Sequence, residues 1–336
     1  MKSYHFNGLF CTMHFGGLPY KTKQFFLVLI KLSIVVGAFY FIYKKLVEND
    51  NLDFSTFLQF LTENNVFSIK NLIFLLLLTF LNWFLEILKW KVLVNSIKNI
   101  SIKNAMEQSL GALTASLFTP NRIGEYGAKA IYYSFEKRKP ILLLNLIGNT
   151  MQMLVTISFG IIGLSILNSK YDLNIDYFKA FRFLIIVVII ILFTFLGLKQ
   201  SKLKIRGFSI EKLKNFYRSI STKTKALGIL LSMMRYLVFS FQFYCFLRFF
   251  GISVSYFNAM VVISSMYFLA SIVPSIFIFD VVIKSSVAVY LFSIVGVNEF
   301  TTLSIVTLMW LFNFVLPSLF GSYYVLNFNL PNNHNQ

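Results

Sequence analysis

The chain has 336 residues, and 31 Lys and Arg against 13 Asp and Glu give it a formal net charge of +18. Only 13% of its residues are charged whereas 57% are hydrophobic, and its mean hydropathy is +0.70. Soluble domains carry about a quarter charged residues, so this composition excludes a soluble enzyme. It also argues against a nucleic-acid-binding protein, which spreads Lys and Arg over a wet surface. The positive excess is instead typical of the cytoplasmic loops of a membrane protein.

Six apolar runs are long enough to cross a bilayer, because a helix needs about 20 apolar residues to span a ~30 Å hydrocarbon layer. The predicted spans cover residues 25–43, 71–88, 141–167, 181–198, 226–250 and 300–326. We therefore predict an all-α integral membrane protein with one polytopic domain over residues 25–328. A cytoplasmic segment at 1–24 precedes this domain, and a cytoplasmic tail at 329–336 follows it.

The charges of the loops predict the orientation. Lys21 and Lys23 precede the first span, whereas the loop after it carries Glu48 and Asp50. Cytoplasmic loops collect Lys and Arg, so the N-terminus is predicted to be cytoplasmic and the acidic loop external. The connection at 199–225 holds nine Lys and Arg against a single acidic residue and belongs inside. Six crossings then place the C-terminus in the cytoplasm as well.

The basic connection also has a helical pattern. Ile210, Leu213 and Phe216 recur three residues apart among Lys and Arg. A short amphipathic helix on the anionic cytoplasmic leaflet would explain this pattern. A solvated basic loop is the alternative, and the sequence favours neither.

Two further apolar segments are too short for ordinary spans. Residues 104–119 are followed by Pro120, and residues 258–273 are followed by Pro274. A helix over 104–119 would cover only about 24 Å. We predict a hairpin of two part-length helices in each place, broken at the proline. The second helix of each hairpin is expected to continue, to Phe135 in the first and to Ser293 in the second.

The two hairpins resemble each other in sequence. The tripeptide Asn-Ala-Met begins at Asn104 and again at Asn258, and a proline follows 16 positions after each Asn. In both copies an acid then precedes a lysine by four residues, which places the pair on one helix face. Repeat halves of about 71–170 and 226–326, separated by an odd number of crossings, would be inverted relative to each other. This is the plan of secondary transporters whose broken helices meet near the middle of the membrane.

The strongest candidate site follows Pro120, where Arg122, Glu125 and Lys129 lie in an apolar setting. Charges at the bilayer centre are costly and usually functional. Free N–H groups at a helix start, with the planar donors of Arg122, suit the phosphate of a lipid headgroup. In the alternative, Glu125 and Lys129 neutralise each other and only tie the hairpin together.

The matching pair in the second hairpin is Asp280 and Lys284, but no arginine or glycine follows Pro274. We interpret this copy as more structural than ligand-binding.

Other polar residues lie within the predicted spans. Glu86 is expected to pair with Lys89, one turn away. Arg235 has no partner in its own segment, so we expect an acid from another span beside it. A polar stripe on the third span favours contacts between helices over a transport path. The members of this stripe are Asn145, Asn149 and Gln152.

The run from Thr119 to Glu125 resembles the Pro-Gly-Arg-x-Gly-Glu signature of a flippase-like transmembrane family related to the membrane domain of lysylphosphatidylglycerol synthases. The run from Leu88 to Leu93 is similar to the basic-Trp element of that family, and the resemblance covers roughly residues 25–326. Asn121 replaces a glycine of the signature. The positions carried over by this resemblance are Pro120, Arg122, Gly124 and Glu125.

The resemblance implies a multi-pass protein of the bacterial cytoplasmic membrane that handles lipids or lipid-linked intermediates. The leading hypothesis is a flippase or transporter that holds an anionic headgroup between the two hairpins. An anionic phospholipid or polyprenyl-linked lipid would be the ligand, and no nucleic acid, cofactor or metal is expected. We expect no lipid aminoacylation, because the soluble transferase domain of the synthases is a separate module.

Two alternatives belong to other classes. One is an integral membrane enzyme acting on lipid phosphate, with Glu125 as base and Lys129 or Arg122 on the phosphate. Few carboxylates and no paired aspartates for Mg²⁺ argue against it. The other is a non-catalytic partner of a membrane glycosyltransferase.

Overall fold

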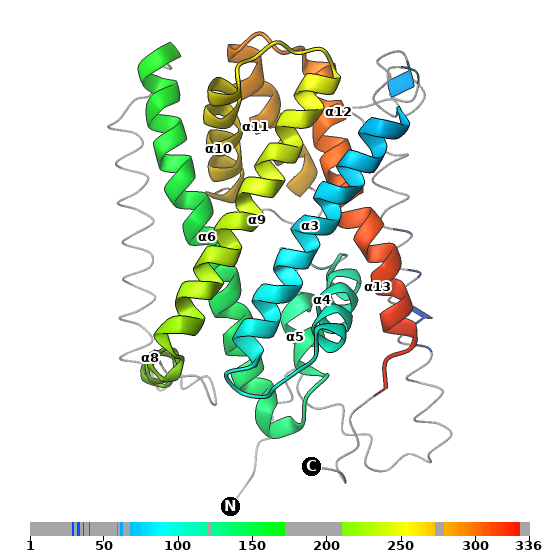
Figure 1. Ribbon diagram of the computed structural model, residues 1–336, viewed down its shortest axis with the longest axis vertical. Coiled ribbons are helices and arrows are strands. Elements are labelled where there is room, and N and C mark those ends of the chain that lie inside the picture. Colours follow the sequence, from blue (N-terminus) through cyan, green and yellow to red (C-terminus); the bar gives the residue numbers. More distant parts are fainter. Residues whose placement is uncertain are drawn as a thin grey trace, which may run out of the picture.

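The computed structural model describes residues 68–117, 119, 123–171, 210–272 and 279–329, together with eight single residues, namely 29, 32, 33, 36, 40, 59, 61 and 62. For residues 210–213 and 279–284 it describes the backbone alone. All secondary-structure elements of the described residues are helices, as Figure 1 shows. The all-α fold class is thus confirmed.

Four helices are long and apolar enough to cross a membrane. They are α3 (Ile69–Val94), α6 (Phe135–Tyr171), α9 (Thr222–Phe249) and a continuous run formed by α12 (Glu299–Trp310), η2 (Leu311–Val315) and α13 (Leu316–Leu326). They coincide with the spans predicted at 71–88, 141–167, 226–250 and 300–326. The spans predicted at 25–43 and 181–198 lie outside the described residues, apart from single positions in the first.

The ends of these helices follow from local chemistry. Ser68, Ser101 and Ser221 each precede a helix, and the hydroxyl of each accepts a hydrogen bond from the N–H three residues later. Such caps satisfy N–H groups that have no partner inside the helix. Helix α6 begins at Phe135, earlier than predicted, and contains Pro140. The proline lies in its second turn, where it removes only one bond near the helix end.

The two predicted hairpins are pairs of shorter helices in contact with each other. The first pair is α4 (Ile102–Ser116) and α5 (Gly124–Ala130), and the second is α10 (Tyr256–Ile272) and α11 (Phe279–Ile294). Both are interrupted where a break was predicted, although Pro120 and Pro274 themselves lie outside the described residues. Helix α5 ends at Ala130, before the expected Phe135, because the chain turns over residues 131–134.

The helix contacts of the two predicted repeat halves correspond to each other. Helices α3 and α9 are in contact and antiparallel, since Glu86 of α3 meets Arg235 of α9 while Leu75 meets Gln242 further along. Helix α6 packs on α10 of the other half, and α13 packs on α4 in the corresponding way. In Figure 1 the α4–α5 pair occupies the lower half of the molecule and the α10–α11 pair the upper half.

Small residues set the two corresponding interfaces. A Cβ added at Gly163 of α6 would collide with Ser264 of α10, and one at Gly321 of α13 would collide with Leu110 of α4. Ser264 and Leu110 are 154 positions apart, which is the offset of the Asn-Ala-Met tripeptides. Backbones approach closely at glycine in membrane helices. The corresponding helix–helix contact therefore occurs in both halves, with a different glycine in each.

The basic connection contains a helix, α8 (Ile210–Ser219), as one of the two predictions for it proposed. Lys225 lies over the ring of Tyr217, with its Nζ 4.4 Å from the ring centroid. A cation over an aromatic face is attracted to it, so this contact ties α8 to the start of α9.

Candidate functional site

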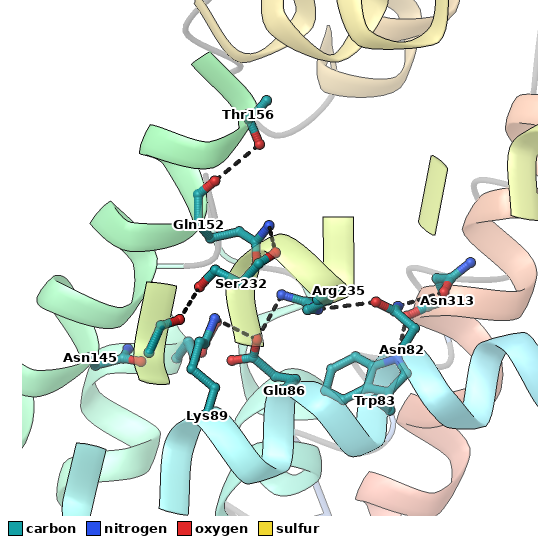
Figure 2. A network of polar contacts seen from close by, with 12 residues as sticks. Asn82, Trp83, Glu86, Lys89, Asn145, Gln152, Thr156, Ser232, Arg235 and Asn313 are labelled. Carbon is teal, nitrogen blue, oxygen red and sulfur yellow. Dashed lines mark hydrogen bonds and ion pairs between the residues drawn. The ribbon is translucent and has the colours of Figure 1, made fainter. Parts of the chain in front are cut away.

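A charge cluster lies where α3 and α9 cross (Figure 2). Lys89 Nζ and Arg235 Nη1 both lie 2.7 Å from Glu86 Oε2, so one carboxylate oxygen is shared by two cations. The side chains of Lys89 and Glu86 are 3% and 8% exposed, whereas that of Arg235 is 21% exposed. The predicted Glu86–Lys89 pair is confirmed, and Glu86 is the acid that was expected beside Arg235.

An amide network continues from this cluster across three helices. Arg235 Nε donates to Asn82 Oδ1 at 3.2 Å, and Asn82 Nδ2 donates to Asn313 Oδ1 at 2.8 Å. Asn313 Nδ2 in turn donates to Gln242 Oε1 at 2.8 Å, and Gln242 Nε2 donates to Thr79 Oγ1 at 2.9 Å. All of these groups except Arg235 are buried. The network therefore joins α3, α9 and η2 near the middle of each helical run.

Asn313 reaches the network from a local π-helix. The turn Leu311–Val315 interrupts the run from Glu299 to Leu326 with wider hydrogen bonding. The carbonyl of Asn313 accepts a bond from Trp83 Nε1 at 2.9 Å, while its amide serves the network described above. Single π-turns within α-helices are frequent at functional sites. Here the turn lets one residue supply side-chain and backbone groups to α3.

A second charged group lies at the first hairpin. Lys129 Nζ donates to Glu125 Oε1 at 2.7 Å and to Asn145 Oδ1 at 3.0 Å. It also lies 4.3 Å from the ring centroid of Trp90, and its side chain is only 1% exposed. Trp90 Nε1 is itself fixed by Gln108 Oε1 at 2.8 Å. Lys129 is therefore enclosed by one carboxylate, one amide and one aromatic face.

The two groups are neighbours on α3, because Lys89 of the charge cluster is adjacent in sequence to Trp90, whose ring contacts Lys129. Together the described residues of this region supply the two carboxylates of Glu86 and Glu125 and three cations, which leaves a formal charge of +1. Arg235 has the most exposed side chain among them. The excess positive charge is thus accessible at Arg235.

The predicted pairing of Glu125 with Lys129 on one helix face is confirmed, which is the geometry of the alternative in which they tie the hairpin together. The N–H of Gly124 is already satisfied by Thr119 Oγ1 at 3.0 Å. A Cβ on Gly124 would lie 2.9 Å from the Thr119 side chain, so glycine permits this close turn.

Several predicted site residues cannot be placed by their side chains. Pro120 and Arg122 lie outside the described residues. Asp280 and Lys284 belong to α11, of which residues 279–284 are described by backbone alone. Their predicted role with a ligand stays a prediction.

The polar stripe of α6 makes contacts between helices, as expected. Asn145 binds Lys129 of α5, as described above, and Asn149 Nδ2 donates to the hydroxyl of Tyr126 at 3.1 Å. Gln152 Nε2 donates to the carbonyl of Ser232 in α9 at 3.3 Å. The stripe thus connects α6 to the hairpin and to α9.

Three central amides, Asn82, Gln242 and Asn313, are not part of any motif in the sequence. Each lies inside a predicted span whose residues are mostly apolar. A buried polar group needs a partner, so one amide in each of three spans is a signal that the spans meet. Their sequence separations of 71 and 231 residues hide the pairing itself.

Membrane-length helices around buried charges define a multi-pass membrane protein. The chain belongs to the family described as the lysylphosphatidylglycerol synthase transmembrane region, which matches residues 28–321. No curated protein and no solved structure matches it. The resemblance seen in the Thr119–Glu125 run is thereby confirmed at the level of the family.

Proposed function

We propose that this protein moves an anionic lipid or lipid-linked intermediate across the membrane and that the phosphate of its headgroup binds Arg235 within the charge cluster. The observation that carries this proposal is the incompletely neutralised guanidinium in the middle of α9. Membership of a family named after a lipid-modifying synthase supports a lipid ligand. The acyl or prenyl chains would stay in the bilayer while the headgroup passes.

Arg235 carries its charge at an energetically costly position. An ionised side chain at the centre of a membrane helix costs about 2.5 to 3.5 kcal/mol on insertion scales. Glu86 and Lys89 both belong to α3 and already balance each other's charge, whereas Arg235 links Glu86 to α9. Arg235 adds a further cation near the middle of its helix. A ligand that carries negative charge gives this cation a function.

The guanidinium of Arg235 is oriented by two hydrogen bonds. A guanidinium offers five N–H groups in a planar fork that matches phosphate oxygens. Nε is bonded to Asn82 and Nη1 to Glu86, and no bond from Nη2 is found within the described part of the chain. These two bonds hold the guanidinium plane in place. Phosphate would meet an oriented donor, which lowers the entropy lost on binding.

Exposed apolar side chains of α3 and α9 lie close in sequence to the cluster. Phe80 and Leu81 of α3 and Met234 and Leu237 of α9 flank the cluster in sequence and are all exposed on the protein. Large apolar side chains that are exposed on membrane helices face lipid. A headgroup at Arg235 would therefore remain connected to chains lying beside these helices.

The test is transbilayer movement in liposomes. The purified protein is reconstituted with fluorescent phosphatidylglycerol, and movement is followed by chemical quenching of the outer-leaflet label. Wild type is expected to exceed protein-free liposomes. Arg235→Gln should lower the protein-dependent rate at least tenfold, because it removes the phosphate donor while leaving the Glu86–Lys89 pair intact.

The matched control is Arg218→Gln, which removes an exposed arginine of α8. Its rate should stay within twofold of wild type. Equal rates in wild type and Arg235→Gln would overturn the proposed site, and a wild-type rate equal to that of empty liposomes would overturn the transport function.

A further inference from the structure

An open groove of about 370 Å³ lies between the first two turns of α3 and the last turn of α9. Its apolar wall includes Ile73, Phe74 and Leu77 of α3 and Phe249 of α9. Ile73, Phe74 and Leu77 are exposed. Lys70 and Arg248 also line it, one from each helix. The groove thus combines an apolar wall with two cations.

The cations of the groove lie at one end of the bundle, and its apolar wall extends from there along α3. Because α3 and α9 are antiparallel, the beginning of α3 and the end of α9 lie at the same end of the bundle, the upper end in Figure 1. Lys70 and Arg248 are therefore both near the membrane boundary. Leu77 lies seven residues deeper on α3, about 10 Å at 1.5 Å per residue. Charge at the boundary and apolar wall beneath it match the layout of a phospholipid.

Local structure does not account for the Lys70 charge. Lys70 lies in the first turn of α3, where the helix dipole disfavours a cation. Within the described part of the chain neither Lys70 nor Arg248 forms an ion pair. The guanidinium of Arg248 makes one long bond, 3.4 Å from Nη1 to the carbonyl of Ile252. In the predicted orientation this end faces outside, where Lys and Arg are uncommon.

We propose that this groove binds one anionic phospholipid of the outer leaflet, with its phosphate between Lys70 and Arg248 and one acyl chain along Ile73, Phe74 and Leu77. The site is distinct from the charge cluster, because Glu86 lies 16 residues from Lys70 on α3, about 24 Å along the axis. The inference goes beyond the proposed function, since a lipid can bind here whether or not the protein moves lipid.

The test is lipid retention by the purified full-length protein. Protein is equilibrated in micelles with equal amounts of phosphatidylglycerol and phosphatidylcholine of the same chains, and bound lipid is counted by native mass spectrometry. Each basic residue near anionic lipid contributes about fivefold to binding. Lys70→Gln/Arg248→Gln should therefore lower the ratio of bound phosphatidylglycerol to phosphatidylcholine about 25-fold at this site.

The matched control is Lys103→Gln/Lys223→Gln, which removes two exposed lysines from the first turns of α4 and α9. It loses the same total charge, but from the beginnings of α4 and α9 and not from the groove. Its ratio should match that of wild type. An unchanged ratio in Lys70→Gln/Arg248→Gln, or an equal fall in this control, would overturn the site.

Leu77→Trp tests the acyl wall without changing charge. The larger side chain should fill the groove and lower retention of both lipids at least threefold, and unchanged retention would contradict the placement of the chain. Lys70→Gln/Arg248→Gln should lower the ratio of retained lipids by the same factor whether or not Arg235→Gln is also present, because the groove is separate from the charge cluster. Transport that persists in Lys70→Gln/Arg248→Gln despite the lowered ratio separates this inference from the proposed function.

Discussion

Two charged groups in the same bundle are built on different principles. Lys129 at the first hairpin is 1% exposed and is enclosed by Glu125, Asn145 and the ring of Trp90. Arg235, where α3 and α9 cross, is 21% exposed and shares its carboxylate with Lys89. The first group is neutral and closed, whereas the second is positive and accessible.

This difference indicates how buried charge is divided between folding and function. A closed pair whose lysine donates to Glu125 and Asn145 holds two helices in one arrangement and has little left for a ligand. An accessible cation that uses only some of its N–H donors for contacts within the protein can exchange water for a phosphate at the others. The strongest motif in the sequence marked the closed group, yet the geometry places the available charge on Arg235.

The largest expected effect comes from removing the shared carboxylate. Glu86→Gln leaves the buried Lys89 beside the partly exposed Arg235 without a counter-charge, and breaking a buried pair costs about 3 to 5 kcal/mol. We expect the free energy of unfolding, measured by denaturant titration in micelles, to fall by that amount. Glu136→Gln, in the exposed first turn of α6, should change it by less than about 1 kcal/mol. A loss in Glu86→Gln no larger than in Glu136→Gln would show that the cluster is not coupled to folding.

The closed group should respond differently, because both of its charges can be removed together. Lys129→Met leaves Glu125 without its ammonium and should lower the free energy of unfolding by about 3 kcal/mol. Glu125→Gln/Lys129→Met should recover at least half of this loss, as the pair is coupled. Transport per folded molecule should stay within threefold of wild type in the double variant. A tenfold loss of transport there would move the ligand site to the hairpin.

The smallest effect is expected in the amide network that orients the open cluster. Gln242→Leu removes the acceptor for Asn313 and the donor to Thr79, so it should cost about 2 kcal/mol in the free energy of unfolding. Gln152→Leu, which loses one bond of 3.3 Å to a carbonyl, should cost less than half as much. Equal losses in the two variants would contradict a structural role for the network. Both are measured by the same denaturant titration.

Much of the architecture could be predicted from the sequence. The four described spans were predicted because length and hydropathy leave few alternatives in a bilayer. The broken hairpins followed from one repeated tripeptide and two prolines. The structure adds that the serines before Asn104 and Asn258, at positions 101 and 255, have hydroxyls that accept from the Asn N–H in both copies.

The site was less predictable than the fold. A cation in an apolar setting needs a counter-charge, and this was enough to expect an acid beside Arg235. It was not enough to identify Glu86 as that acid. Contacts such as that between Asn82 and Asn313 span 231 residues of sequence and depend on how the helices pack. Local spacing also favoured Glu125 and Lys129 as a ligand site. Spacing along one helix does not reveal that Asn145 and Trp90, from other helices, enclose the lysine.

The most direct test of the central claim is the contact between Arg235 and lipid phosphate. Protein with ¹⁵N-labelled arginine is placed in phosphatidylglycerol bilayers, and the loss of guanidinium ¹⁵N signal caused by nearby ³¹P is measured by solid-state NMR. The account predicts that wild type shows a dephased guanidinium signal that is missing from Arg235→Lys, while the signals of the other arginines are the same in both samples. Identical dephasing in the two samples would contradict the account, because Arg235 would then have no phosphate beside it.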